Sequence, residues 1–225
     1  MLPAPGSRPF PESLGRLCSL VAGDTPFSLC SGRSAPYVLA VRDLLGCQAP
    51  VLAEYGAILA RSVNVVATLP GLRGVRRWRA EVRRRLRAAG IMRQAREEIG
   101  KTVVVTVVPA AGGPLAGLRR AVAQALGDLP HSVADSQSAV DLLPPGLDKG
   151  VGLRWWAREV GVELQEACAV GDSAADLPLL RAVGLPACPD NAAAVVRDFV
   201  RGARGLFVPA GSTAGVAQIV GTVWT

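Results

Sequence analysis

The chain has 225 residues, of which 50% are hydrophobic and 19% are charged. This composition excludes a disordered chain and supplies a core for one sizeable domain, or for a core domain with a smaller one. No apolar run reaches the length of a membrane-spanning helix, and the first residues lack the apolar centre of a signal peptide. We therefore expect a cytoplasmic protein without membrane segments.

The types of reactive residue exclude several kinds of site. The five cysteines form no CxxC pair, which argues against a zinc site or a disulfide framework. The single histidine, His131, has no obvious partner, so a Ser-His or Cys-His nucleophile is not expected. Any chemistry should therefore rest on carboxylates, lysine and hydroxyls.

The formal charge of +7 arises from an excess of basic residues in one segment. Residues 71–101 hold eleven Lys or Arg and three Glu, whereas the remaining 14 basic and 15 acidic residues nearly cancel. Residues 73–87 form an arginine-rich amphipathic segment, for which a solvated cationic helix is the simplest interpretation. Nucleic-acid binding through this helix is an alternative interpretation, although interleaved aromatic residues are lacking apart from Trp78.

Helical and strand-like patterns alternate along most of the chain. Because such alternation is typical of parallel sheets with right-handed crossovers, the sequence predicts an α/β fold. The predicted elements are, in chain order, a helix from about Pro11-Glu12 to Gly23, a strand over 27–30, a helix over 35–45 and a strand over 50–53; then a helix over 73–89, a strand over 101–109, a helix over 117–126 and one or two strands in 132–143; and finally a helix over 149–160, strands over 167–170 and 184–187, a helix over 192–200, a strand over 206–209 and a helix over 215–220.

The middle elements form a small α/β layer of their own. Pro144-Pro145-Gly146 marks the return from this layer to the main domain. We therefore predict a Rossmann-like core domain from residues 1–59 and 144–225, with an inserted domain over residues 60–143.

Two carboxylates follow the predicted strand at 167–170. Asp172 lies at the carboxyl end of this strand, where ligands bind in open α/β sheets, and Asp176 lies one helical turn further on. Two carboxylates with a phosphate would favour Mg²⁺, which prefers carboxylate and phosphate oxygens. The alternative is a capping box, with Ser173 as the N-cap and Asp176 three residues later, which leaves Asp172 unexplained.

Two further segments should meet the same crevice. Ser31-Gly32-Arg33 follows the strand at 27–30 and offers a hydroxyl and backbone N–H groups for phosphate, or is a plain N-cap turn. Lys149 opens a helix, where the macrodipole disfavours a cation, and it is one of only two lysines beside 23 arginines. Asp148, or a phosphoryl group together with the two later aspartates, would compensate its charge.

The order of these motifs resembles that of the haloacid dehalogenase-like (HAD) phosphatases. The motifs are SGR, EYGA at 54–57, DKG at 148–150, GDSAADLPLL at 171–180 and PDNAA at 189–193. They look most like those of the Cof-type sugar-phosphate phosphatases, with archaeal phosphoglycolate and mannosyl-3-phosphoglycerate phosphatases as relatives. The resemblance implies that residues 60–143 form a substrate-covering cap.

The resemblance also implies roles for individual residues. Ser31, with Gly32 and Arg33, would bind the transferring phosphoryl group, and Lys149 would neutralise its charge. Asp172 would ligate Mg²⁺, and Asp176 would support Lys149 or the metal. Asn191 matches an asparagine near the phosphate in many relatives. The expected activity is hydrolysis of a small phosphorylated metabolite, such as a sugar phosphate or phosphoglycolate, through an aspartyl-phosphate.

This sequence departs from the family pattern at its first motif. The family begins with a strand ending in DxDGT, which supplies the nucleophile and the general acid/base. The first aspartate here, Asp24, does not follow an apolar strand, and Met1-Leu2-Pro3 resembles the residues that normally follow the motif. We expect a core without this strand, a start site placed too late, and almost no turnover by the chain as written. A catalytically inactive phosphate-binding module is the alternative. Tyr55 and Ala175 each replace a usual asparagine.

Overall fold

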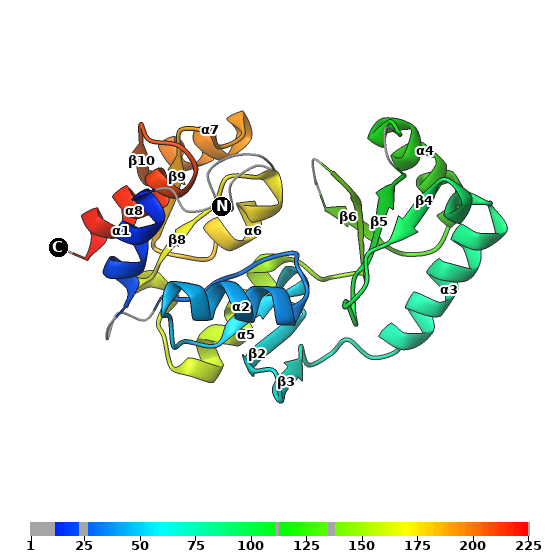
Figure 1. The fold of residues 1–225 in the computed structure, drawn as a ribbon, viewed down its shortest axis with the longest axis horizontal. Coiled ribbons are helices and arrows are strands. Elements are labelled where there is room, and N and C mark those ends of the chain that lie inside the picture. The colour runs from blue at the N-terminus through cyan, green and yellow to red at the C-terminus, as the bar shows by residue number, and fades with distance from the viewer. Residues whose placement is uncertain (1–11, 23–26, 111–112, 135–137, 225) are drawn as a thin grey trace.

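Two lobes with different kinds of sheet make up the described chain (Figure 1). The computed structural model describes residues 12–22, 27–110, 113–134 and 138–224. Helices and strands alternate along the first lobe, whereas the second lobe packs helices on one face of an antiparallel sheet. The α/β fold predicted from the sequence is confirmed. No helix among the described residues is long and apolar enough to cross a membrane.

The first lobe contains both parallel and antiparallel strands. Strands β8, β9 and β10 form a parallel sheet in the order β10-β9-β8, and β1, β2 and β3 form an antiparallel meander. Cys30 joins this meander through a parallel bridge to Leu52. The elements of this lobe are α1 (Glu12–Val21), α2 (Ala35–Leu45), β1 (Val51–Ala53), η1 (Glu54–Gly56), β2 (Ile58–Ser62), β3 (Val65–Thr68), α5 (Lys149–Val160), η3 (Leu164–Glu166), β8 (Cys168–Val170), η4 (Ala174–Asp176), α6 (Leu177–Leu180), β9 (Leu185–Pro189), α7 (Ala194–Gly202), β10 (Leu206–Val208) and α8 (Ser212–Val223).

The second lobe is a four-stranded antiparallel sheet in the order β4-β5-β7-β6, with α3 and α4 against it. Its apolar core joins Val82 and Leu86 of α3 to Val122 and Leu126 of α4 and to the inward face of the sheet. The elements of this lobe are α3 (Val75–Ala88), η2 (Ile91–Arg93), β4 (Ala95–Glu97), β5 (Val105–Pro109), α4 (Leu115–Leu126), β6 (Ser132–Ala134) and β7 (Val140–Leu143).

The strand pairing corrects two details of the sequence-based prediction. The predicted strand over 101–109 begins only at Val105, because the backbone N–H groups of residues 102–104 bind a side chain of the first lobe instead of a neighbouring strand. The alternation of helices and strands before residue 60 predicted parallel strand pairing. Among the described residues there, the Cys30–Leu52 bridge is parallel, but β1 pairs with β2 antiparallel. Asp24 and Met1-Leu2-Pro3 lie outside the described residues.

The division of the chain at residues 59/60 and 143/144 stays a prediction. The meander β1-β2-β3 runs to Thr68, and the helix of the second lobe begins at Val75. Val103 and Val104, which lie between β4 and β5, belong to the apolar core of the first lobe. The two lobes therefore share a buried contact.

Glycines let the elements around the site approach closely. A Cβ on Gly152 of α5 would collide with the backbone of Gly56, so η1 and the first turn of α5 touch backbone to backbone. Asp148 caps α5 by accepting from the N–H of Val151 at 2.8 Å, and Gly161 ends the helix in the left-handed region at φ 73°. These contacts fix the position of Lys149 at the start of α5.

Candidate active site

The SGR turn is held against the meander by its backbone. The N–H of Ser31 donates to the carbonyl of Leu52 at 2.9 Å, and the carbonyl of Ser31 accepts from the N–H of Tyr55 at 3.0 Å. The ring of Tyr55 lies directly against Gly32, where a Cβ would approach it to 2.6 Å. Glycine is therefore required at this position by the neighbouring ring, and the turn cannot shift without moving Tyr55.

Lys149 and Asp176 form a buried ion pair. The Nζ of Lys149 lies 2.5 Å from Oδ1 of Asp176, and both side chains are about 10% exposed. Burial alone would lower the pKa of Lys149, but Asp176, Cys30 and Asp172 together raise it above its usual value. Lys149 therefore carries its charge into the site. Asp148 caps the helix instead of contacting this ammonium group.

Asp176 is fully occupied by its partners. Its Oδ2 accepts from the N–H of Asp172 at 3.1 Å, and from the N–H and hydroxyl of Ser173 at 2.9 and 2.8 Å. Ser173 and Asp176 therefore form the capping box, and the carboxylate of Asp176 also binds Lys149. Burial by itself would raise the pKa of Asp176, but Lys149 and Ser173 hold it below its usual value.

The turn after β8 offers one open carboxylate to a magnesium ion. Both oxygens of Asp176 are taken, and Asp172 is the exposed carboxylate at this position. No group of three His, Cys, Asp or Glu side chains in the described part of the chain is placed to hold a metal ion. Mg²⁺ is usually bound through one or two carboxylates together with substrate oxygens and water, so Asp172 suits one of its ligand positions.

Asp172 and Asn191 lie on neighbouring turns. The carbonyl of Asp172 accepts from the N–H of Ala193 at 2.8 Å, which joins the turn after β8 to the turn after β9. The Oδ1 of Asn191 accepts from the N–H of Ser212 at 2.5 Å and so ties down the start of α8. Asn191 is not among the residues that line the cavity described next.

A cavity of about 770 Å³ brings the other predicted residues together, except Gly32. Its polar rim includes Ser31, Arg33, Lys149, Asp172 and Asp176, which come from segments far apart in the chain. Below the rim, the cavity is lined by apolar side chains of α5, β8 and α8. The predicted convergence of three segments at one rim is what the structure displays, although the role of each residue stays a prediction.

Tyr55 connects this rim to the second lobe. Its hydroxyl donates to Oδ2 of Asp141 on β7 at 2.7 Å, and the Nζ of Lys149 lies 5.8 Å from the centre of its ring. Burial raises the pKa of Tyr55 and the neighbouring Asp141 carboxylate raises it further, so this phenol stays protonated. A second cavity of about 630 Å³ lies beside Tyr55, between the SGR turn and the sheet of the second lobe.

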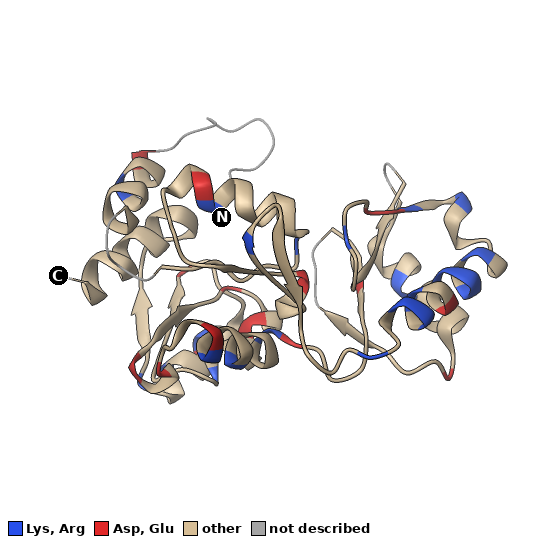
Figure 2. Ribbon diagram, turned by 90° about the horizontal axis from the view of Figure 1, so that it is seen from below, with Lys and Arg blue, Asp and Glu red and all other residues tan. Residues whose placement is uncertain are grey.

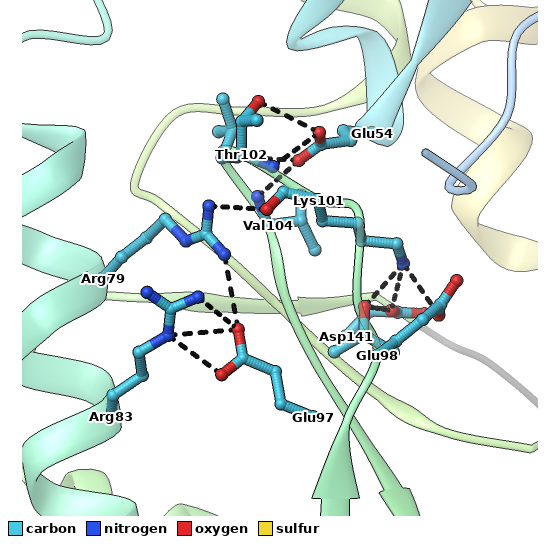
Figure 3. A network of polar contacts seen from close by, with 11 residues as sticks. Glu54, Arg79, Arg83, Glu97, Glu98, Lys101, Thr102, Val104 and Asp141 are labelled. Atoms are coloured by element: carbon cyan, nitrogen blue, oxygen red, sulfur yellow. Dashed lines mark hydrogen bonds and ion pairs between the residues drawn. The ribbon is translucent and has the colours of Figure 1, made fainter. Parts of the chain in front are cut away.

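A polar network fixes the second lobe against the first (Figure 3). The carboxylate of Glu54, which is 1% exposed, accepts from the N–H groups of Thr102, Val103 and Val104 at 2.8, 2.8 and 2.9 Å. The carbonyl of the preceding Lys101 accepts from Arg79 of α3 at 2.7 Å. Residues 101–104 are thus held by the first lobe on one side and by α3 on the other.

Lys101 is a buried cation that sequence reasoning missed. Its Nζ donates to the hydroxyl of Thr106 at 2.6 Å and lies 3.2 Å from Glu98 and 3.4 Å from Asp141. A usable signal was present, because the scarcity of lysine that singles out Lys149 applies equally to Lys101. Glu54 carried no such signal, since its partners lie about fifty residues away in the chain.

Comparison with known sequences identifies similar proteins. Residues 94–201 match the haloacid dehalogenase-like hydrolase family. A phosphoglycolate phosphatase of Methanopyrus kandleri is 30% identical over 170 residues, which cover 74% of this chain and 70% of that protein. An Escherichia coli 5-amino-6-(5-phospho-D-ribitylamino)uracil phosphatase is 32% identical over 79 residues, which cover 35% of this chain and 29% of that protein.

Solved structures share the fold over nearly the whole chain. A Thermoplasma acidophilum protein superposes with a TM-score of 0.70 at 19% identity, covering 94% of this chain and 88% of that chain. The sucrose-phosphatase of Synechocystis, solved with sucrose and phosphate, superposes with a TM-score of 0.63 at 14% identity, covering 94% of this chain and 91% of that one. At these identities the likeness concerns the fold alone.

Proposed function

The chain belongs to the haloacid dehalogenase-like hydrolases, and from this membership we propose that it serves as a phosphatase for a small phosphorylated metabolite such as phosphoglycolate or a sugar phosphate. The observation that supports this most directly is the rim of the larger cavity. There the hydroxyl of Ser31 and the ammonium group of Lys149 line the same space as the exposed carboxylate of Asp172. A hydroxyl and a fixed cation are suited to the charge of a phosphoryl group.

Three of the rim residues have separate parts in the proposed reaction. Lys149 neutralises the phosphoryl oxygens, Ser31 donates a hydrogen bond to one of them, and Asp176 holds Lys149 in place. In the aspartyl-phosphate route, an aspartate oxygen bonds to phosphorus as the ester P–O bond breaks. A second carboxylic acid protonates the leaving oxygen, and water then cleaves the acyl phosphate. The sequence contains no DxDGT motif to supply these two aspartates, and the Asp176 carboxylate is occupied.

Magnesium dependence is part of the proposal, with Asp172 as one ligand. Phosphate oxygens of the substrate and water would take other positions around the ion. Such an ion would supply electrostatic stabilisation of the phosphoryl oxygens. The cytoplasmic location expected from the sequence stays a prediction.

Phosphate binding tests the proposal without any need for turnover. We expect calorimetry to detect binding of inorganic phosphate and of phosphoglycolate to the chain, and Lys149→Met to weaken it at least tenfold. Arg154→Met, which removes an exposed cation from the same helix, is the matched control and should bind as the parent does. Equal binding by both variants would contradict the assignment of Lys149.

Hydrolysis of p-nitrophenyl phosphate tests the enzyme against the inactive module. The chain as written should release phosphate barely above background. A chain extended at its amino terminus by an apolar strand ending in DxDG should gain activity that EDTA removes. Phosphate binding without hydrolysis by the extended chain would support the inactive phosphate-binding module instead.

A further inference from the structure

The turn η1, which follows β1, has a strained backbone. Its residues Glu54, Tyr55 and Gly56 all have positive φ, at 50°, 61° and 89°. Glycine adopts this left-handed region freely, but a residue with a Cβ is strained there and keeps the conformation only where its surroundings hold it. Tyr55 also replaces an asparagine of the family pattern, and asparagine tolerates this region better than tyrosine does. Contacts outside the turn must therefore hold Glu54 and Tyr55 in place.

The backbone of η1 holds the SGR turn. The N–H of Glu54 donates to the carbonyl of Arg33 at 2.9 Å, and the N–H of Tyr55 donates to the carbonyl of Ser31 at 3.0 Å. These two bonds tie the first and the last residue of the SGR turn to consecutive residues of η1. The position of the Ser31 hydroxyl therefore depends on the backbone at residues 54 and 55.

The side chains of the same two residues are held from the other direction. The carboxylate of Glu54 accepts from the N–H groups of residues 102–104, which lead directly into β5 of the second lobe. The hydroxyl of Tyr55 donates to Asp141 on β7. Glu54 and Tyr55 are 1% and 6% exposed, so both side chains are closed off from solvent. Each residue thus binds the SGR turn through its N–H and the second lobe through its side chain.

The third residue of η1 rests against α5. A Cβ on Gly56 would lie 2.7 Å from the Cα of Gly152, so the backbones of η1 and α5 are in direct contact. With α5 behind the turn, the contacts of Glu54 and Tyr55 to the second lobe are the ones that hold the two strained residues.

We propose that Glu54 and Tyr55 are positioning residues, through which the placement of the second lobe sets the SGR turn and with it the Ser31 hydroxyl. That this turn receives phosphate rests on the proposed function, whereas its coupling to the second lobe does not. Because linkage between two sites is reciprocal, a ligand on the SGR turn also strengthens the contacts of residues 102–104.

Amide exchange in the ligand-free chain tests the coupling by itself. Tyr55→Phe removes the hydroxyl that reaches Asp141 and keeps the ring against Gly32. We expect exchange of the N–H groups of residues 31, 54 and 55 to accelerate roughly tenfold more than exchange at residues 59 and 60 of β2. Equal acceleration at both places would reveal a general loss of stability and overturn the positioning role, as would unchanged exchange at residues 31, 54 and 55.

Binding of inorganic phosphate tests the consequence for the site. Calorimetry should show binding to Tyr55→Phe that is at least threefold weaker than binding to the parent. Trp78→Phe is the matched control, since it removes a 2.9 Å hydrogen bond to Pro130 within the second lobe and lines neither cavity. It should bind phosphate as the parent does. Should Tyr55→Phe fail to fold, Glu54→Gln makes the same test with a weaker acceptor for residues 102–104. Equal binding by the folded variant and the control would overturn the positioning role.

The reciprocal effect separates this inference from the proposed function. Saturating phosphate should slow exchange at residues 102–104 of the parent at least threefold more than exchange at Val122 and Leu126 of α4, although residues 102–104 line neither cavity. Equal slowing at both places would overturn the coupling. A parent chain that binds no phosphate would contradict the proposed function, and the exchange of the ligand-free variants then decides the coupling alone.

Discussion

The hydroxyl of Tyr55 donates to Oδ2 of Asp141 across the two lobes at 2.7 Å. The ring of Tyr55 packs on Gly32, and Asp141 lies on the sheet that faces the smaller cavity. The carboxylate of Asp141 also receives the hydroxyl of Thr106 and contacts Lys101. A movement of the second lobe would therefore disturb the SGR turn directly.

Tyr55→Phe should destabilise the protein by about 1–2 kcal/mol, since it removes the hydrogen bond to a buried carboxylate but keeps the ring against Gly32. Urea unfolding measures the change. The other tyrosine, Tyr37, is 42% exposed, so Tyr37→Phe is the matched control and should change stability by less than about 0.5 kcal/mol. Equal effects of the two variants would show that the bond between the lobes contributes nothing.

Glu54→Ala should cost roughly 3–5 kcal/mol, because it leaves the N–H groups of residues 102–104 without their buried acceptor. Glu54→Gln retains one acceptor oxygen and should cost less. Glu159→Ala, at a half-exposed position that contacts Arg61 only at 3.8 Å, serves as the control. Amide exchange at residues 102–104 should accelerate in Glu54→Ala. Unchanged exchange there would show that the Glu54 carboxylate does not protect these N–H groups.

The pair of Lys149 and Asp176 predicts how stability depends on pH. The pKa of Asp176 is lowered on folding, so its contribution is present above the unfolded-state value of about 3.9 and is lost as pH falls through the lower folded value. The pKa of Lys149 is raised, so its contribution is lost as pH rises through a value above about 10.4. Asp176→Asn should therefore flatten the loss of unfolding free energy between about pH 5 and 2, as measured by urea unfolding at each pH. Asp190→Asn, at an exposed position, should leave this acid limb as steep as in the parent.

Local signals placed most helices and parts of the site correctly. The helix at 149–160 was predicted at its observed bounds, because Asp148 before it and Gly161 after it are strong start and stop residues. The arginine-rich helix, predicted over 73–89, spans Val75–Ala88. A cation at a helix start needs compensation, for which the sequence offered Asp148 or the two later aspartates with a phosphoryl group; the contact observed is with Asp176.

Contacts between distant residues were beyond the reach of sequence patterns. The apolar, β-branched run at 101–109 reads as one strand, but Glu54 takes the N–H groups of its first part. Cys168, Ala169 and Val170 read as a buried strand and are instead partly exposed, since the pattern of a strand does not state which of its edges is paired. Asp141 was missed because its partners Tyr55, Lys101 and Thr106 lie 35 to 86 residues away in the chain.

Cysteine reactivity reports on the walls of the larger cavity, at Cys30 and Cys168, and on the apolar core, at Cys47. Burial raises the pKa of the Cys30 thiol to about 12, and it raises those of Cys47 and Cys168 to about 11. Because the thiolate is the nucleophile, alkylation of Cys47 and Cys168 at pH 8 should be roughly 100-fold slower in the folded chain than in urea, and that of Cys30 slower still. Peptide mapping after iodoacetamide treatment measures each rate. Rapid labelling of folded Cys30 would contradict its raised pKa.

The partners of the α3 arginines bear on whether this helix binds nucleic acid. Figure 2 shows Lys and Arg gathered on the helices of the second lobe. Several of these side chains have intramolecular partners, with Arg79 and Arg83 on Glu97 and with Arg84 and Arg85 on Glu81.

We therefore expect weak binding to duplex DNA, which should vanish between 50 and 200 mM salt because it rests on the few arginines that remain exposed. Glu97→Gln, which weakens the ion pair of the partly exposed Arg83, should strengthen binding at 50 mM salt. Fluorescence anisotropy with a labelled duplex measures both effects, and Glu163→Gln, far from α3 in the sequence, is the control. Binding that persists at 200 mM salt would favour a nucleic-acid role for this helix, since the paired arginines would then be contacting phosphate in spite of Glu97 and Glu81.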